Sequence, residues 1–262
     1  MNNISEDSFV VKKLKESGAI VLGKTNLSEW AYYFCVGCPL GYSAIGGQTL
    51  NPYGRKIFES GGSSSGSGVA ISANLSSVAL GPETSGSILS PSSLNSIVGL
   101  KPTIGLVSRN GIVPISSTLD TSGPMTKNVI DNVIVFNSIM GFDDNDSYSK
   151  ERIDVNIKQI TNSSLSGVRL GVFKELLNEP LYKKAIAEIQ EAGGTIIEFE
   201  PPKINFSGFR KILDVDMKKE LPEYLLKYSK QNLDVKNISD IMNFNLKDSL
   251  KRSPYGQGIF EG

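Results

Sequence analysis

The sequence predicts an α/β protein, because helical and strand patterns alternate along it. A helical apolar stripe at residues 9–14 predicts a helix over 7–17, and the short apolar segment 19–23 after it predicts a buried strand. Between residues 168 and 199, a strand pattern, an amphipathic helix and a second strand pattern follow one another. This order is typical of a parallel βαβ unit, and it favours the α/β class.

The composition excludes several classes of protein. The chain has 262 residues, of which 39% are apolar and 21% charged, as in ordinary globular proteins. Its formal net charge is zero, which gives no sign of binding to nucleic acid or to an anionic membrane. No apolar run approaches the roughly 20 residues that span a bilayer. Residues 1–9 lack a signal-peptide pattern, so we expect a cytoplasmic location.

The first elements follow from local signals. Ser5 is a candidate helix cap with acids directly after it, and Gly18 predicts the helix end. Residues 34–68 are rich in Gly, Ser, Pro, Tyr and Asn, which predicts a long ordered loop or several tight turns. A flexible linker is the rival interpretation, but apolar segments continue directly after it at 69–71 and 78–80.

The later elements are predicted in the same way. Asn110-Gly111 predicts a two-residue hairpin turn of type I′, since both residues tolerate positive φ. Residues 128–140 predict a buried helix ending at Gly141, and the polar stretch 142–166 predicts a surface crossing. The charged pattern from 209 to 252 is helical.

Cys35 and Cys38 form a Cys-x-x-Cys pair. A structural zinc site needs about four ligands, and the chain has no histidine and no further cysteine. A redox motif usually opens a helix, whereas Gly37 and Pro39 place this pair in a loop. We interpret the two residues as reduced thiols without a special role.

Two serine-bearing glycine loops carry the strongest functional signal. The first covers residues 61–68, and the second covers residues 83–88. A serine nucleophile needs an exposed turn, a base, and N–H groups that face the oxyanion. Without histidine, the proton carrier has to be a lysine or a second serine. The alternatives are plain turns, or a phosphate loop, although the Gly-Lys-Ser/Thr ending of a P-loop is missing.

Several segments together resemble the amidase signature family, from about Asp7 to about Asp144 and more weakly beyond. Their order and spacing match as a set, and the likeness is to the peptide-amide and small-amide hydrolases rather than to the transfer-RNA amidating subunit. The matching segments are 18–30, 46–49, 51–53, 60–67, 80–91, 99–109 and 120–125.

The resemblance implies a Ser-Ser-Lys triad. Ser87 matches the nucleophile, and Ser63 matches the bridging serine, whose preceding peptide bond is cis in the family. The N–H groups of Thr84, Ser85, Gly86 and Ser87 match the oxyanion hole. The implied fold is a mixed, twisted sheet flanked by helices, an α/β/α sandwich, here incomplete. We expect a single domain over 1–262, with a core at 7–144 and a peripheral part at 145–262.

The sequence departs from the family pattern in ways that bear on activity. Where the family commonly has Gly-Thr-Asp/Glu, this chain has Gly81-Pro82-Glu83, and Ser65 and Ser67 replace later glycines of the first serine loop, where a serine at positive φ would be strained. The family lysine lies in a strand before the helix equivalent to 7–17, a strand that this sequence lacks. Lys24 and Lys101 lie in matching segments but do not match that base.

We therefore predict an amidase-family protein with absent or very weak hydrolysis of carboxamide C–N bonds. The alternatives are a non-catalytic remnant that binds an amide or a partner, and a half that another segment complements in trans. The expected ligand is a small amide, with no cofactor, metal, nucleic acid or membrane. Unpaired strand edges further predict marginal stability or self-association.

Overall fold

The computed structural model describes residues 6–153, 155–161, 164–229 and 234–261. By internal contacts the chain divides into two compact units. The first comprises Met1–Val155 with Phe209–Gly262, and the second is Asn156–Gly208. Each unit is described by itself, and the assignment of 1–262 to one domain stays a prediction.

A three-stranded antiparallel sheet forms the centre of the first unit. The strand order is β3-β5-β4, with β3 at Val78–Glu83, β4 at Val98–Gly99 and β5 at Thr121–Thr126. All six residues of β5 are buried, so both faces of the central strand are covered. The chain is therefore a mixed α/β structure, as the sequence predicts.

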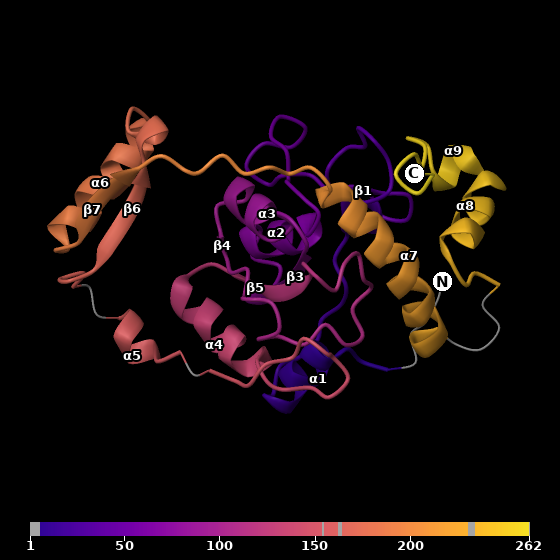
Figure 1. Ribbon diagram of the computed structural model, residues 1–262, viewed down its shortest axis with the longest axis horizontal. Helices are drawn as coiled ribbons and strands as arrows, with labels where there is room; N and C mark the ends of the chain where they lie inside the picture. The colour runs from indigo at the N-terminus through magenta and orange to yellow at the C-terminus, as the bar shows by residue number, and fades with distance from the viewer. Residues whose placement is uncertain (1–5, 154, 162–163, 230–233, 262) are drawn as a thin grey trace. The chain divides into compact units, whose positions relative to one another are not determined.

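Helices cover this sheet (Figure 1). Both α2 (Ser65–Ser72) and α4 (Val129–Ile139) contact β5, and α3 (Leu89–Leu94) contacts β4. The helix α1 (Phe9–Glu16) packs against α4, and Val10, Phe136 and Ile139 meet in one apolar cluster. The predicted helices at 7–17 and 128–140 are thus confirmed, although the first begins two residues later than predicted. The cap of α1 is Ser8, and the predicted cap, Ser5, lies outside the described residues.

A second apolar cluster joins the loop after residue 30 to the helices α7 (Phe209–Tyr228) and α8 (Ile238–Leu246) and to Phe260. The short helix α9 (Ser249–Arg252) follows α8. Phe34 packs there with Met217 and Leu221 of α7. The 3-10 turn η1 (Glu29–Tyr32) precedes the predicted long loop, which contains a small hairpin of β1 (Tyr42–Ser43) and β2 (Gly47–Gln48). The helical prediction for 209–252 is confirmed at 209–228, 238–246 and 249–252, and residues 230–233 lie outside the described residues.

The prediction of reduced thiols is wrong. Cys35 and Cys38 form a disulfide inside this second cluster, and both residues are buried. The tight loop brings their Cα atoms to 5.8 Å, within the range that a disulfide spans. Sequence spacing alone does not reveal this, because it depends on how the loop turns.

Two local predictions are also wrong. Residues 19–23 form no strand, and they are exposed rather than buried. The segment at Asn110-Gly111 is a turn, closed by a hydrogen bond from the N–H of Ile112 to the carbonyl of Arg109 at 2.9 Å, but no strands flank it. Positive φ occurs at Gly111 and not at Asn110, so the turn is not type I′.

The second unit consists of one βαβ motif and one short helix. The strands β6 (Arg169–Phe173) and β7 (Thr195–Phe199) pair in parallel, and α6 (Pro180–Glu191) connects them after the 3-10 turn η2 (Lys174–Leu176). The helix α5 (Ile157–Ile160) precedes them, within the stretch predicted as a surface crossing. The predicted parallel pairing is confirmed.

The described ranges contain neither a candidate membrane span nor a candidate metal site. None of the helices there combines the length and apolar character of a membrane span. No group of three or more Cys, Asp or Glu side chains in those ranges is placed to hold a metal ion.

Candidate active site

The nucleophile loop begins where β3 ends. The carboxylate of Glu83 is buried, and its Oε2 atom accepts the N–H groups of Ile88 at 2.7 Å and Leu89 at 3.0 Å. These two bonds close the loop over residues 84–87 and fix the start of α3. Glu83 therefore shapes the loop that presents Ser87.

Four consecutive N–H groups in this loop stay available. Across the described residues, no hydrogen bond uses the main-chain N–H of Thr84, Ser85, Gly86 or Ser87. Gly86 has φ of +90°, which lets the chain turn sharply just before Ser87. All four residues line one cavity, so an oxyanion placed there could accept from these donors.

The loop that carries Ser63 turns at two glycines. Gly61 has φ of +66°, and the peptide bond between Gly62 and Ser63 is cis, as the resemblance implies. Ser65 and Ser67 lie in α2 without positive φ, so the predicted strain at these serines is absent. Ser63 is 1% exposed, and its hydroxyl has no hydrogen-bond partner among the described residues.

The structure brings the two serine loops together. The N–H of Ser64 donates to the carbonyl of Ser87 at 3.1 Å, and the hydroxyl of Ser64 donates to the carbonyl of Pro82 at 3.1 Å. Two cavities, of about 360 Å³ and about 270 Å³, meet at these loops. Ser63, Thr84 and Ser87 line both, so the two predicted catalytic serines face shared space.

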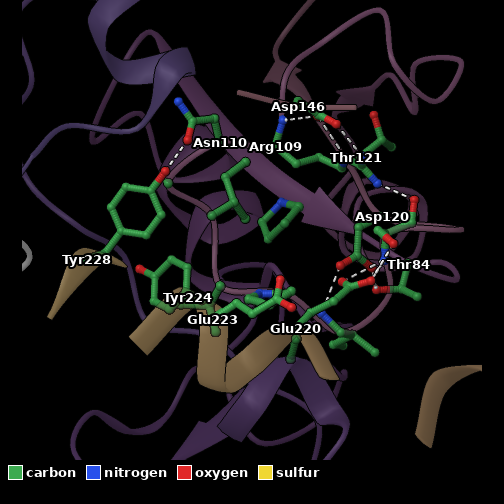
Figure 2. A pocket seen from close by; sticks show the side chains of 18 of the residues that line it. Thr84, Arg109, Asn110, Asp120, Thr121, Asp146, Glu220, Glu223, Tyr224 and Tyr228 are labelled. Atoms are coloured by element: carbon green, nitrogen blue, oxygen red, sulfur yellow. Dashed lines mark hydrogen bonds and ion pairs between the residues drawn. The ribbon is translucent and has the colours of Figure 1, made fainter. Parts of the chain in front are cut away.

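Asp120 fixes the nucleophile loop from the side (Figure 2). Its Oδ1 atom accepts the hydroxyl of Thr84 at 2.5 Å, and its Oδ2 atom accepts the N–H groups of Ile115 at 2.8 Å and Ser116 at 2.9 Å. Burial raises the pKa of Asp120, although these hydrogen bonds act in the opposite direction. Asp120 thus links the oxyanion segment to the loop at 115–118.

Helix α7 forms the opposite wall of the larger cavity. Figure 2 shows Glu220, Glu223, Tyr224 and Tyr228 projecting from it toward the cavity. Glu220 accepts the N–H of Ser117 at 2.9 Å, which ties this helix to the loop at 115–118. Burial raises the pKa of Glu220, the hydrogen bond from the Ser117 hydroxyl lowers it, and the charge of Asp216 raises it further.

Arg109 and Asp146 form an ion pair at the edge of the same cavity. The Nε atom and the N–H of Arg109 donate to Oδ2 of Asp146 at 2.9 Å and 2.8 Å, and the guanidinium reaches Oδ1 as well. The two side chains are 12% and 3% exposed. Burial opposes the charge of Asp146, but the bonds from Arg109 outweigh it and hold the pKa of Asp146 below its ordinary value.

The two serines and the segment 84–87, which the sequence predicts as catalytic, line shared cavities, but sequence reasoning missed these supporting groups. Asp120 and Arg109 lie in segments that carry the family resemblance, which was the available signal for them. Nothing in the sequence marked Glu220 or Tyr224, because a charged helix with scattered aromatics reads as a solvated face. Lys24 is exposed, and neither it nor Lys101 contacts the Ser63 hydroxyl.

Residues 1–253 match the sequence profile of the amidase family, and the chain belongs to that family. It is similar to a probable amidase of Arabidopsis thaliana, with 38% identity over 98% of this chain and 52% of that one. It also resembles one subunit of the glutamyl-tRNA(Gln) amidotransferase of Symbiobacterium thermophilum, with 40% identity over 77% of this chain and 41% of the relative.

Solved structures give the same result. The peptide amidase of Stenotrophomonas maltophilia superposes with a TM-score of 0.89 at 38% identity, over 98% of this chain and 54% of that one. An amidase family protein of Bacillus anthracis superposes with a TM-score of 0.91 at 37% identity, over 98% and 52%. The fold is therefore the amidase-signature fold, and the chain spans about half the length of these relatives.

Proposed function

We propose that this chain carries the acyl-transfer side of an amidase site. In this scheme Ser87 Oγ attacks the carbonyl carbon of a carboxamide and gives its proton to the Ser63 hydroxyl, which passes its own proton on toward the leaving nitrogen. The N–H groups of residues 84–87 hold the oxyanion, and the C–N bond breaks as the amine leaves with a proton. Water then hydrolyses the acyl-Ser87 ester. The observation that carries the proposal is the run of four free N–H groups beside two serines that share a cavity.

We further propose that the described residues hydrolyse unactivated amides very weakly. The buried hydroxyl of Ser63 has no partner among them, so no base is placed to take the proton. Loss of one member of a catalytic triad costs about 10⁴–10⁶ in turnover in another serine hydrolase. This corresponds to roughly 5.5–8 kcal/mol of barrier.

The substrate class that fits best is a peptide amide or another small amide. The combined space on both sides of Ser87 accommodates a short peptide, and a peptide amidase is among the structures with this fold. We also propose that the described elements are part of the α/β/α sandwich that the resemblance implies, since α2 and α4 both pack on the buried strand β5.

The test is acylation by an activated ester, p-nitrophenyl acetate, whose leaving group needs no proton. Intact-mass measurement should show one acetyl group on the chain, on the peptide that contains Ser87. Ser87→Ala should abolish it, whereas Ser93→Ala, at an exposed serine of α3, should leave it unchanged. Equal acetylation of the Ser87→Ala variant would refute the assignment of the nucleophile.

A parallel assay with small carboxamides tests the second part of the proposal. We expect no turnover above that of the Ser87→Ala variant. Robust turnover that depends on Ser87 would show that a base is present after all. If neither acetylation nor turnover occurs but amides raise the melting temperature, the alternative of a non-catalytic amide-binding protein is supported.

A further inference from the structure

The wall that α7 gives to the larger cavity is acidic. Glu220 and Glu223 lie on one face of the helix, and Figure 2 shows both projecting toward the cavity. Glu220 is partly buried and accepts the N–H of Ser117. Glu223 is exposed, and its carboxylate takes part in no hydrogen bond or ion pair within the described ranges. The chemistry proposed for Ser87 uses neither carboxylate.

The cations around the cavity do not neutralise these two glutamates. The cations that line it are Arg109, Lys219 and Lys227. Arg109 is engaged by Asp146, and Lys227 donates to Oδ1 of Asn110 at 3.3 Å. Across the described residues, no ion pair joins either glutamate to a lysine or an arginine. The α7 wall therefore offers negative charge that nothing in this part of the chain compensates.

Neighbouring carboxylates strengthen this negative charge. Asp216 lies one turn before Glu220 on α7, and its Oδ2 atom accepts the hydroxyl of Thr118 at 2.9 Å. Burial raises the pKa of Glu220, the hydrogen bond from the Ser117 hydroxyl lowers it, and the charges of Asp216 and Asp120 raise it again. These acids repel one another, and a cation bound beside them would relieve the repulsion. In the described part of the chain, no three acidic side chains are placed to hold a metal ion, so an organic cation fits better.

Two hydroxyls in the same cavity point independently to a ligand. Thr121 and Ser63 both line the larger cavity, and each residue is 1% exposed. Neither hydroxyl has a hydrogen-bond partner among the described residues. A buried hydroxyl without a partner is costly, and a bound molecule with a polar group can supply one. Thr121 lines the larger cavity and not the smaller one, so its hydroxyl is available to a part of the ligand other than the oxyanion.

We propose that the larger cavity selects carboxamides whose side chain ends in an ammonium group, which Glu220 and Glu223 bind. The inference rests on the proposed function for the position of the carboxamide, whose carbonyl lies at Ser87 in the space that both cavities share. The rest of the substrate extends through the larger cavity to α7. Thr121 offers its hydroxyl to a polar group of the substrate, and the ring of Tyr224 adds a face that attracts cations.

A neutral or an anionic side chain fits this wall less well. A neutral side chain would displace water from Glu220 without giving the carboxylate a new partner, which costs free energy. An anionic side chain would meet like charge at α7, and the buried cation of the cavity, Arg109, is already held by Asp146. An ammonium group avoids both costs, because it donates hydrogen bonds and carries the opposite charge.

Isothermal titration calorimetry with three related amides tests the preference for charge. N-acetyl-lysinamide carries the ammonium group, N-acetyl-norleucinamide lacks it, and the α-amide of N-acetyl-glutamic acid carries a carboxylate instead. We expect the lysine amide to bind at least about tenfold more tightly than the norleucine amide, and the glutamic acid amide to bind most weakly. Added salt should reduce the difference, since Glu223 is exposed and its charge is screened.

Substitutions at the two glutamates make the test specific. The double change Glu220→Gln and Glu223→Gln should abolish the preference for the lysine amide. The control is the double change Glu175→Gln and Glu191→Gln, which removes the same charge at two exposed glutamates of the second unit and should leave the preference intact. Glu223→Gln alone breaks no side-chain contact within the described residues, and it should reduce the preference about threefold.

The inference is overturned if the lysine and norleucine amides bind equally, if the change of both α7 glutamates leaves the preference intact, or if none of the three amides binds. Acetylation of Ser87 by p-nitrophenyl acetate is measured on the same preparations. Acetylation without a preference for charge refutes this inference alone. A preference for charge without acetylation refutes the assignment of the nucleophile and supports the cation site. Circular dichroism checks that each variant keeps the fold.

Discussion

The pKa values of two buried carboxylates beside the larger cavity are shifted in opposite directions from their ordinary value. Asp120 is held by hydrogen bonds from a hydroxyl and two N–H groups, and burial dominates, so its pKa is raised. Asp146 faces the guanidinium of Arg109, and its pKa is lowered despite burial. At both carboxylates hydrogen bonds and the charge of Arg109 oppose desolvation, and they outweigh it at Asp146 but not at Asp120.

The lowered pKa of Asp146 predicts how stability depends on pH. Its charge stabilises the fold above the ordinary value of 3.8, and this contribution is lost as the pH falls through the lower folded value. Asp146→Asn should therefore reduce the free energy of unfolding by about 3 kcal/mol at neutral pH, because Arg109 is left buried without its partner. Urea unfolding at several pH values measures this.

The expected difference between the two proteins shrinks toward zero in acid. Asp144→Asn is the matched control, since Asp144 is an exposed neighbour, and its effect should be small at every pH. A loss of stability in Asp146→Asn that stays constant down to low pH would contradict the assignment, because it would show that the carboxylate charge is not what stabilises the fold.

The residues of the candidate site were predictable to different degrees. Ser87 and Ser63 lie in short motifs whose glycines and order carry information, so the sequence located them. The roles of Asp120 and Glu220 depend on contacts between segments far apart in the chain, such as the bond from Ser117 to Glu220. No local pattern encodes such contacts, so these roles emerged only from the structure.

At the scale of elements, Gly61 couples the loop that carries Ser63 to α3. Its φ of +66° disfavours any other residue, and a Cβ atom placed there would lie 2.8 Å from the main-chain Cα and N of Pro91. Gly18 offers a matched case, with φ of +86° and no atom within 4 Å of such a Cβ. The two positions differ in crowding and not in the sign of φ.

We therefore expect Gly61→Ala to destabilise the protein by more than Gly18→Ala. Both variants incur about 1–2 kcal/mol for alanine in the left-handed region. Gly61→Ala should cost about 1–3 kcal/mol in addition, because the backbone of α3 has to shift. Chemical denaturation of the two variants gives the difference. Equal losses of unfolding free energy in the two variants would show that the backbone around Pro91 shifts at little cost.

Elements whose partners are local in sequence were predicted well, and those with distant partners were not. The helix α4 carries its own cap, Asn128, which accepts the N–H of Asp131 at 2.9 Å, and its boundaries matched the prediction closely. Residues 19–23 have the apolar run of a buried strand, yet the described residues supply no strand to pair with them. The apolar pattern favours a buried strand, but the described residues offer no neighbouring strand with which it could pair.

At the scale of the whole molecule, the two units differ in how much apolar surface they bury. The first unit has two apolar clusters and a sheet whose central strand is wholly buried. In the second unit, Val172 is the single buried residue among those that the structure describes. Parallel sheets normally occur with both faces covered, so a two-stranded parallel sheet with so little burial is a weak element.

This contrast predicts uneven protection of main-chain amides against hydrogen exchange. Local opening requires little free energy where few apolar contacts are lost, so β6 and β7 should exchange faster than β3 and β5. Mass spectrometry of exchange at neutral pH, resolved by peptide, measures both sheets in one experiment. The four strands can be compared directly because they are similar in length: β3 and β5 have six residues, and β6 and β7 have five. Equal protection would mean that both sheets open only in global unfolding. The unit Asn156–Gly208 would then be more stable than its few buried residues suggest.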